Sequence, residues 1–135
     1  MILLDTNVVS ELRKGDRADT NVRAWLSSTD SEALFLSVLV VGELRRGIEL
    51  VRRRDSASAT ALDRWLTTVV RDYDDRILEV TADVAEAWAH MNVPDPLPVI
   101  DSLLAATAHV HGLTVATRNT KDIARTGVPV INPFS

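Results

Sequence analysis

The chain has 135 residues, of which 46% are hydrophobic and 25% are charged, and its formal net charge is -4. This length fits one domain with its own hydrophobic core, which we place over residues 1–135, and the composition is not that of a disordered protein. No cysteine is present, which excludes a disulfide scaffold, a zinc–thiolate site, an iron–sulfur cluster and a cysteine nucleophile. Because the chain is acidic overall, contact with a nucleic acid would need a local basic patch or metal ions bound by its carboxylates.

The apolar run at the start of the chain, Met1–Leu4, ends at once at Asp5. We therefore expect neither a secretory signal nor the roughly 20 apolar residues of a membrane span. The expected location is the cytoplasm, with no membrane contact.

Short apolar runs alternate with stretches of helical periodicity along the whole chain. Strands are predicted at residues 1–4, 33–36, 76–80, 113–117 and 128–131. Helices are predicted over segments that contain residues 8–12, 22–26, 40–51, 62–69, 84–91 and 101–108. The longest pattern follows the second strand, where Ser37 is a candidate N-cap and Val40, Leu44 and Ile48 recur every four residues on one helical face.

Strands separated by helices imply right-handed crossover connections and a mainly parallel sheet that is covered on both faces. We therefore predict an α/β protein, a three-layer α/β/α sandwich with about five strands. No repeat, linker or low-complexity segment divides the chain.

Acidic residues fall where the carboxyl ends of the predicted strands lie. Asp5 directly follows the first strand, Asp101 opens a helix, and Asn119 and Asp122 follow the fourth strand. Glu43 lies in the first turns of the helix after the second strand, beside its apolar stripe. Ligands of open parallel sheets bind beyond the carboxyl ends of the strands, so we predict that these side chains converge at one edge.

Each acid also has a purely structural interpretation. Asp5 could only cap a helix, and Asp101 could only favour the positive end of its helix. Glu43 is harder to explain in this way, because a carboxylate beside a core stripe needs a partner. Clustered carboxylates repel one another, and hard divalent cations such as Mg²⁺ relieve that repulsion. Hydrolysis of a phosphodiester is the reaction most often built on such a cluster.

Four segments of the chain resemble known sequence motifs in the same order. They are DTNVVSEL at residues 5–12, Ser37–Val38 with GELRRG at residues 42–47, PVIDSLLAATA at residues 98–108, and TRNTKD at residues 117–122. Together they are similar to the PIN-domain ribonucleases, and more narrowly to the VapC toxins of type II toxin–antitoxin pairs, including the FitB-like branch. The resemblance extends over the whole chain and implies a single PIN domain.

The resemblance implies a Mg²⁺-dependent endoribonuclease, in which Mn²⁺ can substitute, with Asp5, Glu43 and Asp101 as its metal-binding and catalytic acids. The fourth acidic position of the family is open here, because both Asn119 and Asp122 are candidates for it. The implied partners are an RNA substrate, a VapB-like antitoxin and a second copy of the chain. Contact with DNA is expected only through the antitoxin.

Polar and basic residues near the acids are candidates for binding substrate. Thr6 and Ser37 could orient a phosphate, although capping of the local helix is the favoured role of both hydroxyls. Arg118 suits bidentate contact with a phosphate. Five arginines cluster further along, and a solvated helix face is favoured over contact with RNA for them: Arg45, Arg46, Arg52, Arg53 and Arg54.

Other functions remain as alternatives. A phosphoacceptor signalling domain and an aspartate-nucleophile phosphatase are disfavoured, because Asp5 is followed by Thr6 and Asn7 where those proteins need further acids. A non-enzymatic partner-binding domain and a DNA-acting PIN-like nuclease stay open.

Overall fold

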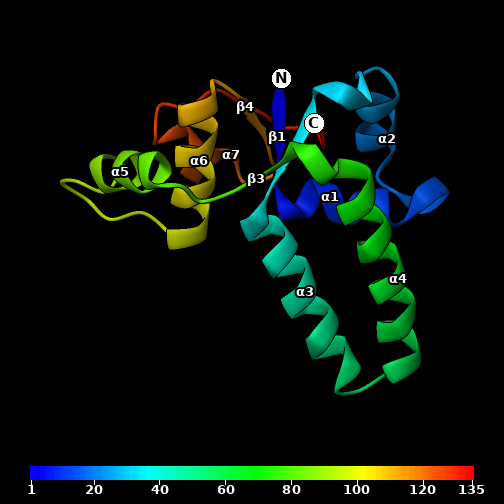
Figure 1. Ribbon diagram of the computed structural model, residues 1–135. Helices are drawn as coiled ribbons and strands as arrows, with labels where there is room; N and C mark the ends of the chain where they lie inside the picture. The colour runs from blue at the N-terminus through cyan, green and yellow to red at the C-terminus, as the bar shows by residue number, and fades with distance from the viewer.

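The computed structural model describes residues 1–135, and its helices surround a five-stranded sheet (Figure 1). The strands are β1 (Ile2–Leu4), β2 (Leu34–Ser37), β3 (Ile77–Leu78), β4 (Thr114–Ala116) and β5 (Val130–Ile131). The α-helices are α1 (Thr6–Leu12), α2 (Thr20–Ser27), α3 (Val38–Arg52), α4 (Ser56–Tyr73), α5 (Ala82–Met91), α6 (Val99–His111) and α7 (Thr120–Ala124). Short 3₁₀-helices are η1 (Gly15–Arg17), η2 (Ser31–Ala33) and η3 (Asp74–Arg76).

All strand pairs are parallel, and the order across the sheet is β3-β2-β1-β4-β5. The chain runs outward from β1 to β3, and then crosses to the other side of β1 to form β4 and β5. Helices α1 to α4 cover one face of the sheet, and α5 to α7 cover the other (Figure 1). The predicted three-layer α/β/α sandwich is confirmed.

The three central strands form the middle of the core. Leu3, Leu4, Leu36 and Val115 are completely buried. Helix α6 contributes small buried side chains that allow it to pack closely against its neighbours, namely Ala105, Ala106 and Ala108. No helix of the structure has the length and apolar character that spanning a membrane requires.

The two edge strands are shorter than predicted. Arg76, expected in the third strand, belongs to η3, and its guanidinium donates to the carbonyl oxygens of Ser31 at 2.8 Å and Leu34 at 2.7 Å. Val80, at the other end of that prediction, lies past the sheet and is 40% exposed. Strand β5 begins only after Pro129, since proline has no N–H for the ladder. The 3₁₀-helices and α7 were not predicted.

Helices α3 and α4 form an antiparallel hairpin that projects beyond the sheet (Figure 1). The predicted stripe of α3 is confirmed, because Val40, Leu44 and Ile48 are its buried residues. Leu66 and Val69 are buried on α4. The opposite faces of the hairpin are free to contact other molecules.

Gly47 lies inside α3, and a Cβ atom added to it would meet nothing within 4 Å. We expect Gly47→Ala to raise the free energy of unfolding by about 0.5–1 kcal/mol, because alanine loses less backbone entropy in a helix. Urea denaturation measures this difference. Gly112→Ala is the matched control, since Gly112 caps α6 with φ 66° and alanine there should destabilise the fold by about 1–2 kcal/mol. A loss of stability in Gly47→Ala would contradict the expectation.

Candidate functional site

The chain leaves β1 and β4 in opposite directions, although these strands are neighbours at the centre of the sheet. Their carboxyl ends therefore flank a topological switch point, where parallel sheets bind ligands. Asp5 follows β1 and Thr117 follows β4. The backbone N–H of Asp5 donates to the carbonyl oxygen of Ala116 at 2.9 Å, which fixes the two strand ends together.

Asp5 is only 6% exposed and both of its carboxylate oxygens are held. Oδ1 accepts from the backbone N–H of Thr6 at 2.7 Å, so Asp5 does cap α1. Oδ2 accepts from the hydroxyl of Thr117 at 2.7 Å. Each oxygen keeps a second lone pair, so the capping role leaves Asp5 able to bind a cation.

Thr117 is completely buried, and its hydroxyl forms several hydrogen bonds at this edge of the sheet. Besides donating to Asp5, its Oγ1 accepts from the backbone N–H of Asn119 at 2.9 Å and from Nδ2 of Asn7 at 3.5 Å. Oδ1 of Asn7 accepts from the backbone N–H of Arg118 at 3.2 Å. This bridging role of Asn7 was not predicted; the signal in the sequence was its position two residues after Asp5.

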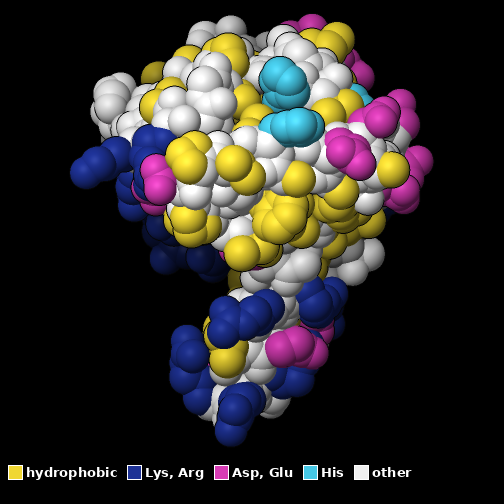
Figure 2. Space-filling view, turned by 90° about the vertical axis from the view of Figure 1, so that its left-hand side faces the viewer, with side chains coloured by type: hydrophobic (Ala, Val, Ile, Leu, Met, Phe, Trp, Pro, Cys, Tyr) yellow, Lys and Arg dark blue, Asp and Glu magenta, His cyan; other side chains and the backbone are white.

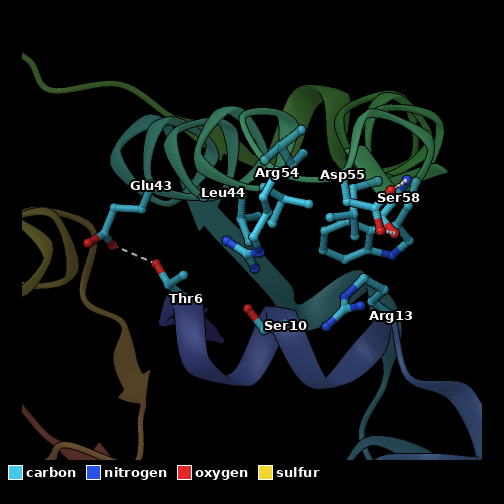
Figure 3. Close-up of a pocket in the computed structure, with 13 residues that line it drawn as sticks. Thr6, Ser10, Arg13, Glu43, Leu44, Arg54, Asp55 and Ser58 are labelled. Carbon is cyan, nitrogen blue, oxygen red and sulfur yellow. Dashed lines mark hydrogen bonds between the residues drawn. The ribbon is translucent and has the colours of Figure 1, made fainter. Parts of the chain in front are cut away.

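Glu43 reaches the same edge from α3. Its Oε1 accepts from the Thr6 hydroxyl at 2.6 Å, so Thr6 orients a carboxylate (Figure 3). Glu43 lies beside the apolar stripe of α3, as predicted, although its side chain is exposed. This contact links the start of α1 to the first turns of α3.

The two remaining acids are bridged by an amide. Nδ2 of Asn119 donates to Oδ2 of Asp101 at 3.0 Å and to Oδ2 of Asp122 at 3.2 Å. Both candidates for the fourth position are therefore at the site: Asp122 brings a carboxylate, and Asn119 brings a hydrogen-bond donor.

The electrostatics of Asp101 show that the acids are gathered together. Its pKa is raised, first by burial and then by repulsion from Asp5, Asp122 and Glu43, while the hydrogen bond from Asn119 acts in the opposite direction. Burial alone raises the pKa of a carboxyl, but the repulsion from Asp5, Asp122 and Glu43 requires that these three charges lie near Asp101. The structure thus brings the four predicted acids to one edge of the sheet.

The donor set of this edge suits a hydrated divalent cation. No group of three acidic or histidine side chains is arranged to hold one metal ion directly. Mg²⁺ in proteins is commonly held by one or two carboxylates and keeps several waters, so it does not need three direct ligands. The oxygen chemistry of the four acids fits such an ion.

Ser37 and Arg118 are both candidates for contact with substrate, but Ser37 is buried and Arg118 is exposed. Ser37 is completely buried, and its Oγ accepts from the backbone N–H of Leu39 at 3.0 Å, so it caps α3. Capping is the role that the sequence favoured for this hydroxyl, and a contact of Ser37 with substrate stays a prediction. Arg118 is exposed beside the acids, and its guanidinium lies 3.8 Å from the centre of the Phe134 ring.

A cavity of about 510 Å³ lies between α1, α3 and α4 (Figure 3). Thr6 and Glu43 contribute to its lining, so it adjoins the acidic site. Arg13 and Arg54 also border it. Its apolar lining consists of Leu44, Ile48, Val51, Leu62 and Trp65.

We expect Asp101→Asn to stabilise the metal-free protein at neutral pH and to raise Tm by about 2–4 °C. A carboxyl whose pKa is raised on folding costs stability once it ionises, and the substitution removes that charge. The gain should vanish as the pH falls through about 4, where the wild-type carboxyl is neutral in both states. Thermal melts in EDTA across this pH range measure the effect, and an unchanged or lowered Tm at neutral pH would contradict it.

Comparison with known proteins identifies the family. A PIN domain model matches residues 2–129. The chain is 34% identical to toxin FitB of Neisseria gonorrhoeae, over 99% of each protein, and 34% identical to VapC ribonuclease Y4jK of Sinorhizobium fredii, over 99% of this chain and 98% of that protein. The crystal structure of FitAcB from Neisseria gonorrhoeae is similar with a TM-score of 0.91 and 35% identity, over 99% of each chain. The chain therefore belongs to the PIN-domain family, within the group of FitB-like VapC toxins.

Proposed function

We propose that this chain is a Mg²⁺-dependent endoribonuclease and the toxin of a toxin–antitoxin pair, and that Mn²⁺ can replace Mg²⁺. The observation that carries the proposal is the cluster of four carboxylates at the switch point, with the raised pKa of Asp101 as its electrostatic signature. The similarity to a protein named VapC ribonuclease supports the reaction class.

The residues of the cluster have distinct tasks in this proposal. Asp5, Glu43 and Asp101 would hold Mg²⁺, which activates water and neutralises charge on the phosphodiester when it is bound. The hydroxyl of Thr6 orients Glu43, and the hydroxyl of Thr117 orients Asp5. Asn119 keeps the carboxylates of Asp101 and Asp122 at a fixed separation.

Arg118 would bind a phosphate of the substrate next to the cluster. Its guanidinium is exposed, and stacking over Phe134 restricts its position. A guanidinium that is already ordered loses less side-chain entropy when it forms a bidentate contact with phosphate.

The reaction is tested by incubating the purified chain with single-stranded RNA in Mg²⁺, in Mn²⁺ and in EDTA. We expect cleavage with either cation, none in EDTA, and a strong loss of activity in Glu43→Gln. Single-stranded DNA of the same sequence is the control for a DNA-acting nuclease. If neither nucleic acid is cut with either cation, the chain is a partner-binding domain and the proposal fails.

A VapB-like antitoxin is the proposed protein partner, and the complex would contact DNA through the antitoxin. Solved structures of similar chains support this, since they include FitAB bound to a DNA fragment. The cavity beside Glu43 suits an apolar antitoxin segment, because Leu62 and Trp65 line it and it adjoins the acidic site at Glu43. A homodimer remains an expectation from the family.

Filling the cavity should weaken inhibition by the antitoxin. Ser10 lies on α1, lines the cavity and makes no side-chain hydrogen bond, so Ser10→Trp adds bulk without removing a contact. We expect the inhibition constant of the cognate antitoxin to rise by at least about tenfold, since a blocked pocket removes a central anchor. Thr20→Trp on α2 is the matched control outside the cavity, because the exposed side chain of Thr20 likewise makes no hydrogen bond. Equal inhibition of both variants would contradict this placement.

A further inference from the structure

Positive charge is concentrated on the projecting hairpin of α3 and α4. Residues 45–54 contain five arginines and a single acid, although the whole chain has a net charge of -4. Figure 2 shows Lys and Arg side chains gathered on the hairpin where it extends away from the body. A basic projection on an acidic protein favours contact with a polyanion.

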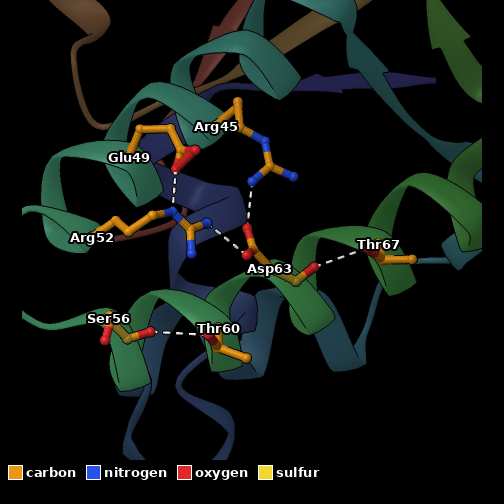
Figure 4. A network of polar contacts seen from close by, with 7 residues as sticks. All are labelled: Arg45, Glu49, Arg52, Ser56, Thr60, Asp63 and Thr67. Atoms are coloured by element: carbon orange, nitrogen blue, oxygen red, sulfur yellow. Dashed lines mark hydrogen bonds and ion pairs between the residues drawn. The ribbon is translucent and has the colours of Figure 1, made fainter.

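One row of these arginines is already neutralised within the protein. Arg45 and Arg52 both form ion pairs with Asp63 of α4, and Nη2 of Arg52 lies 2.6 Å from Oδ2 of that carboxylate (Figure 4). Arg52 also pairs with Glu49 at 2.8 Å. Hydrogen bonds from Arg52 and Arg45 lower the pKa of Asp63. These two arginines therefore join α3 to α4, and the paired carboxylates largely neutralise their charge.

A second row on the same helix has no acidic partner. Arg46 and Arg53 are exposed and form neither an ion pair nor a side-chain hydrogen bond. Arg53 is the C-cap of α3 and keeps the helical backbone conformation, so it lies two turns from Arg46 on the same face, about 10 Å along the axis. Glu43 is one turn before Arg46 on nearly the same face, which places Arg53 about 15 Å along the helix from the acid.

Arg46 also borders the acidic site directly. It lines a hollow of about 650 Å³ together with Thr6, Glu43 and Ile100. The row of Arg46 and Arg53 therefore begins at the cluster and leads away from it along the hairpin. A phosphate backbone leaving the cluster could follow this row.

We propose that Arg46 and Arg53 bind backbone phosphates of the RNA on one side of the cleaved bond. This inference rests on the proposed ribonuclease function and adds a requirement for substrate length. A separation of about 15 Å corresponds to roughly four or five stacked nucleotides at about 3.4 Å each. RNAs that extend at least this far from the cleaved bond are therefore the preferred substrates.

The test compares a long RNA with a short one. The double variant Arg46→Gln/Arg53→Gln and the wild type are assayed on an RNA of about 20 nucleotides and on a tetranucleotide that contains the same cleavage site. We expect the preference for the long RNA, measured as the ratio of the two kcat/KM values, to fall on the order of tenfold at about 0.1 M salt. The salt dependence of the long-RNA KM should weaken by about 1.4 in logarithmic slope, or 0.7 for each lost phosphate contact.

Control variants show whether the effect depends on the positions of Arg46 and Arg53 or only on the total positive charge of the protein. Arg17→Gln/Arg64→Gln removes two exposed arginines outside residues 45–54 that also form no ion pair, and it should keep the preference for long RNA. Arg46→Lys/Arg53→Lys should restore most of it, since lysine keeps the positive charge.

Three results would overturn the inference. A preserved long-RNA preference in Arg46→Gln/Arg53→Gln would refute the phosphate row while leaving the ribonuclease function standing. An effect of this variant on antitoxin inhibition alone would assign the row to a protein partner. Absence of RNA cleavage by the wild type with either cation would instead refute the proposed function, on which the inference rests.

Discussion

Replacing Asp101 with asparagine is expected to lower Mg²⁺-dependent RNA cleavage by at least about a thousandfold, which corresponds to about 4 kcal/mol of transition-state stabilisation. The asparagine still accepts the hydrogen bond from Asn119 but brings no negative charge to the cation. Asp5→Asn should cause a loss of similar size, because it removes the most buried acid of the cluster. Single-turnover cleavage of a labelled RNA measures both variants.

The matched control for charge is Asp95→Asn, in the exposed loop between α5 and α6. It removes the same carboxylate from a position outside the cluster and should cleave RNA like the wild type. Circular dichroism and thermal melts show whether each variant is folded. Wild-type cleavage by folded Asp101→Asn and Asp5→Asn would contradict the proposed role of the cluster.

Removing the buried hydroxyl of Thr117 is expected to affect both stability and activity. Thr117→Val leaves Oδ2 of Asp5 without its donor and the backbone N–H of Asn119 without its acceptor. Unpaired buried polar groups of this kind cost about 1–3 kcal/mol of unfolding free energy. Cleavage should also fall, because Asp5 is no longer held in one orientation. Urea denaturation and kcat are the two measurements.

Thr114→Val is the control for this substitution. Thr114 is the first residue of β4, the strand that Thr117 follows, its side chain is half-buried, and its hydroxyl makes no hydrogen bond within the protein. Its replacement should leave both stability and cleavage near the wild-type values. If Thr117→Val were as stable and active as Thr114→Val, Thr117 would not support Asp5.

The layers of the fold were predictable because they follow from hydrophobic patterning. The buried central strands are nearly continuous apolar runs, and the stripe of Val40, Leu44 and Ile48 has helical spacing. The edge strands were less predictable, because tertiary contacts limit them. Arg76 lies in η3 and not in the strand, and its guanidinium donates to the carbonyl oxygens of Ser31 and Leu34, which are distant in sequence.

The gathering of the acids could be expected from strand order alone, since Asp5 and Asp122 follow strands that end at the same edge. Their metal-binding and catalytic roles remain predictions. The bridging role of Asn7 depends on the distance between α1 and the end of β4, which the sequence does not specify. The capping role of Ser37 could be predicted, because a hydroxyl between a strand and an apolar helical stripe is a typical N-cap.

The division of the arginines into two rows was also beyond sequence analysis. Arg45 and Arg46 are adjacent and look equivalent, but only Arg45 faces Asp63 of the neighbouring helix. Which arginine is neutralised depends on how α3 packs on α4. The row of Arg46 and Arg53 could therefore be identified only from the structure.

Asp5, Glu43 and Asp101 are proposed to hold a hydrated divalent cation at the switch point. Anomalous diffraction from crystals soaked in millimolar Mn²⁺ locates such an ion directly. We expect an anomalous peak beside Asp5, Glu43 and Asp101. A well-ordered site without any Mn²⁺ peak, in a protein that still cleaves RNA, would contradict it.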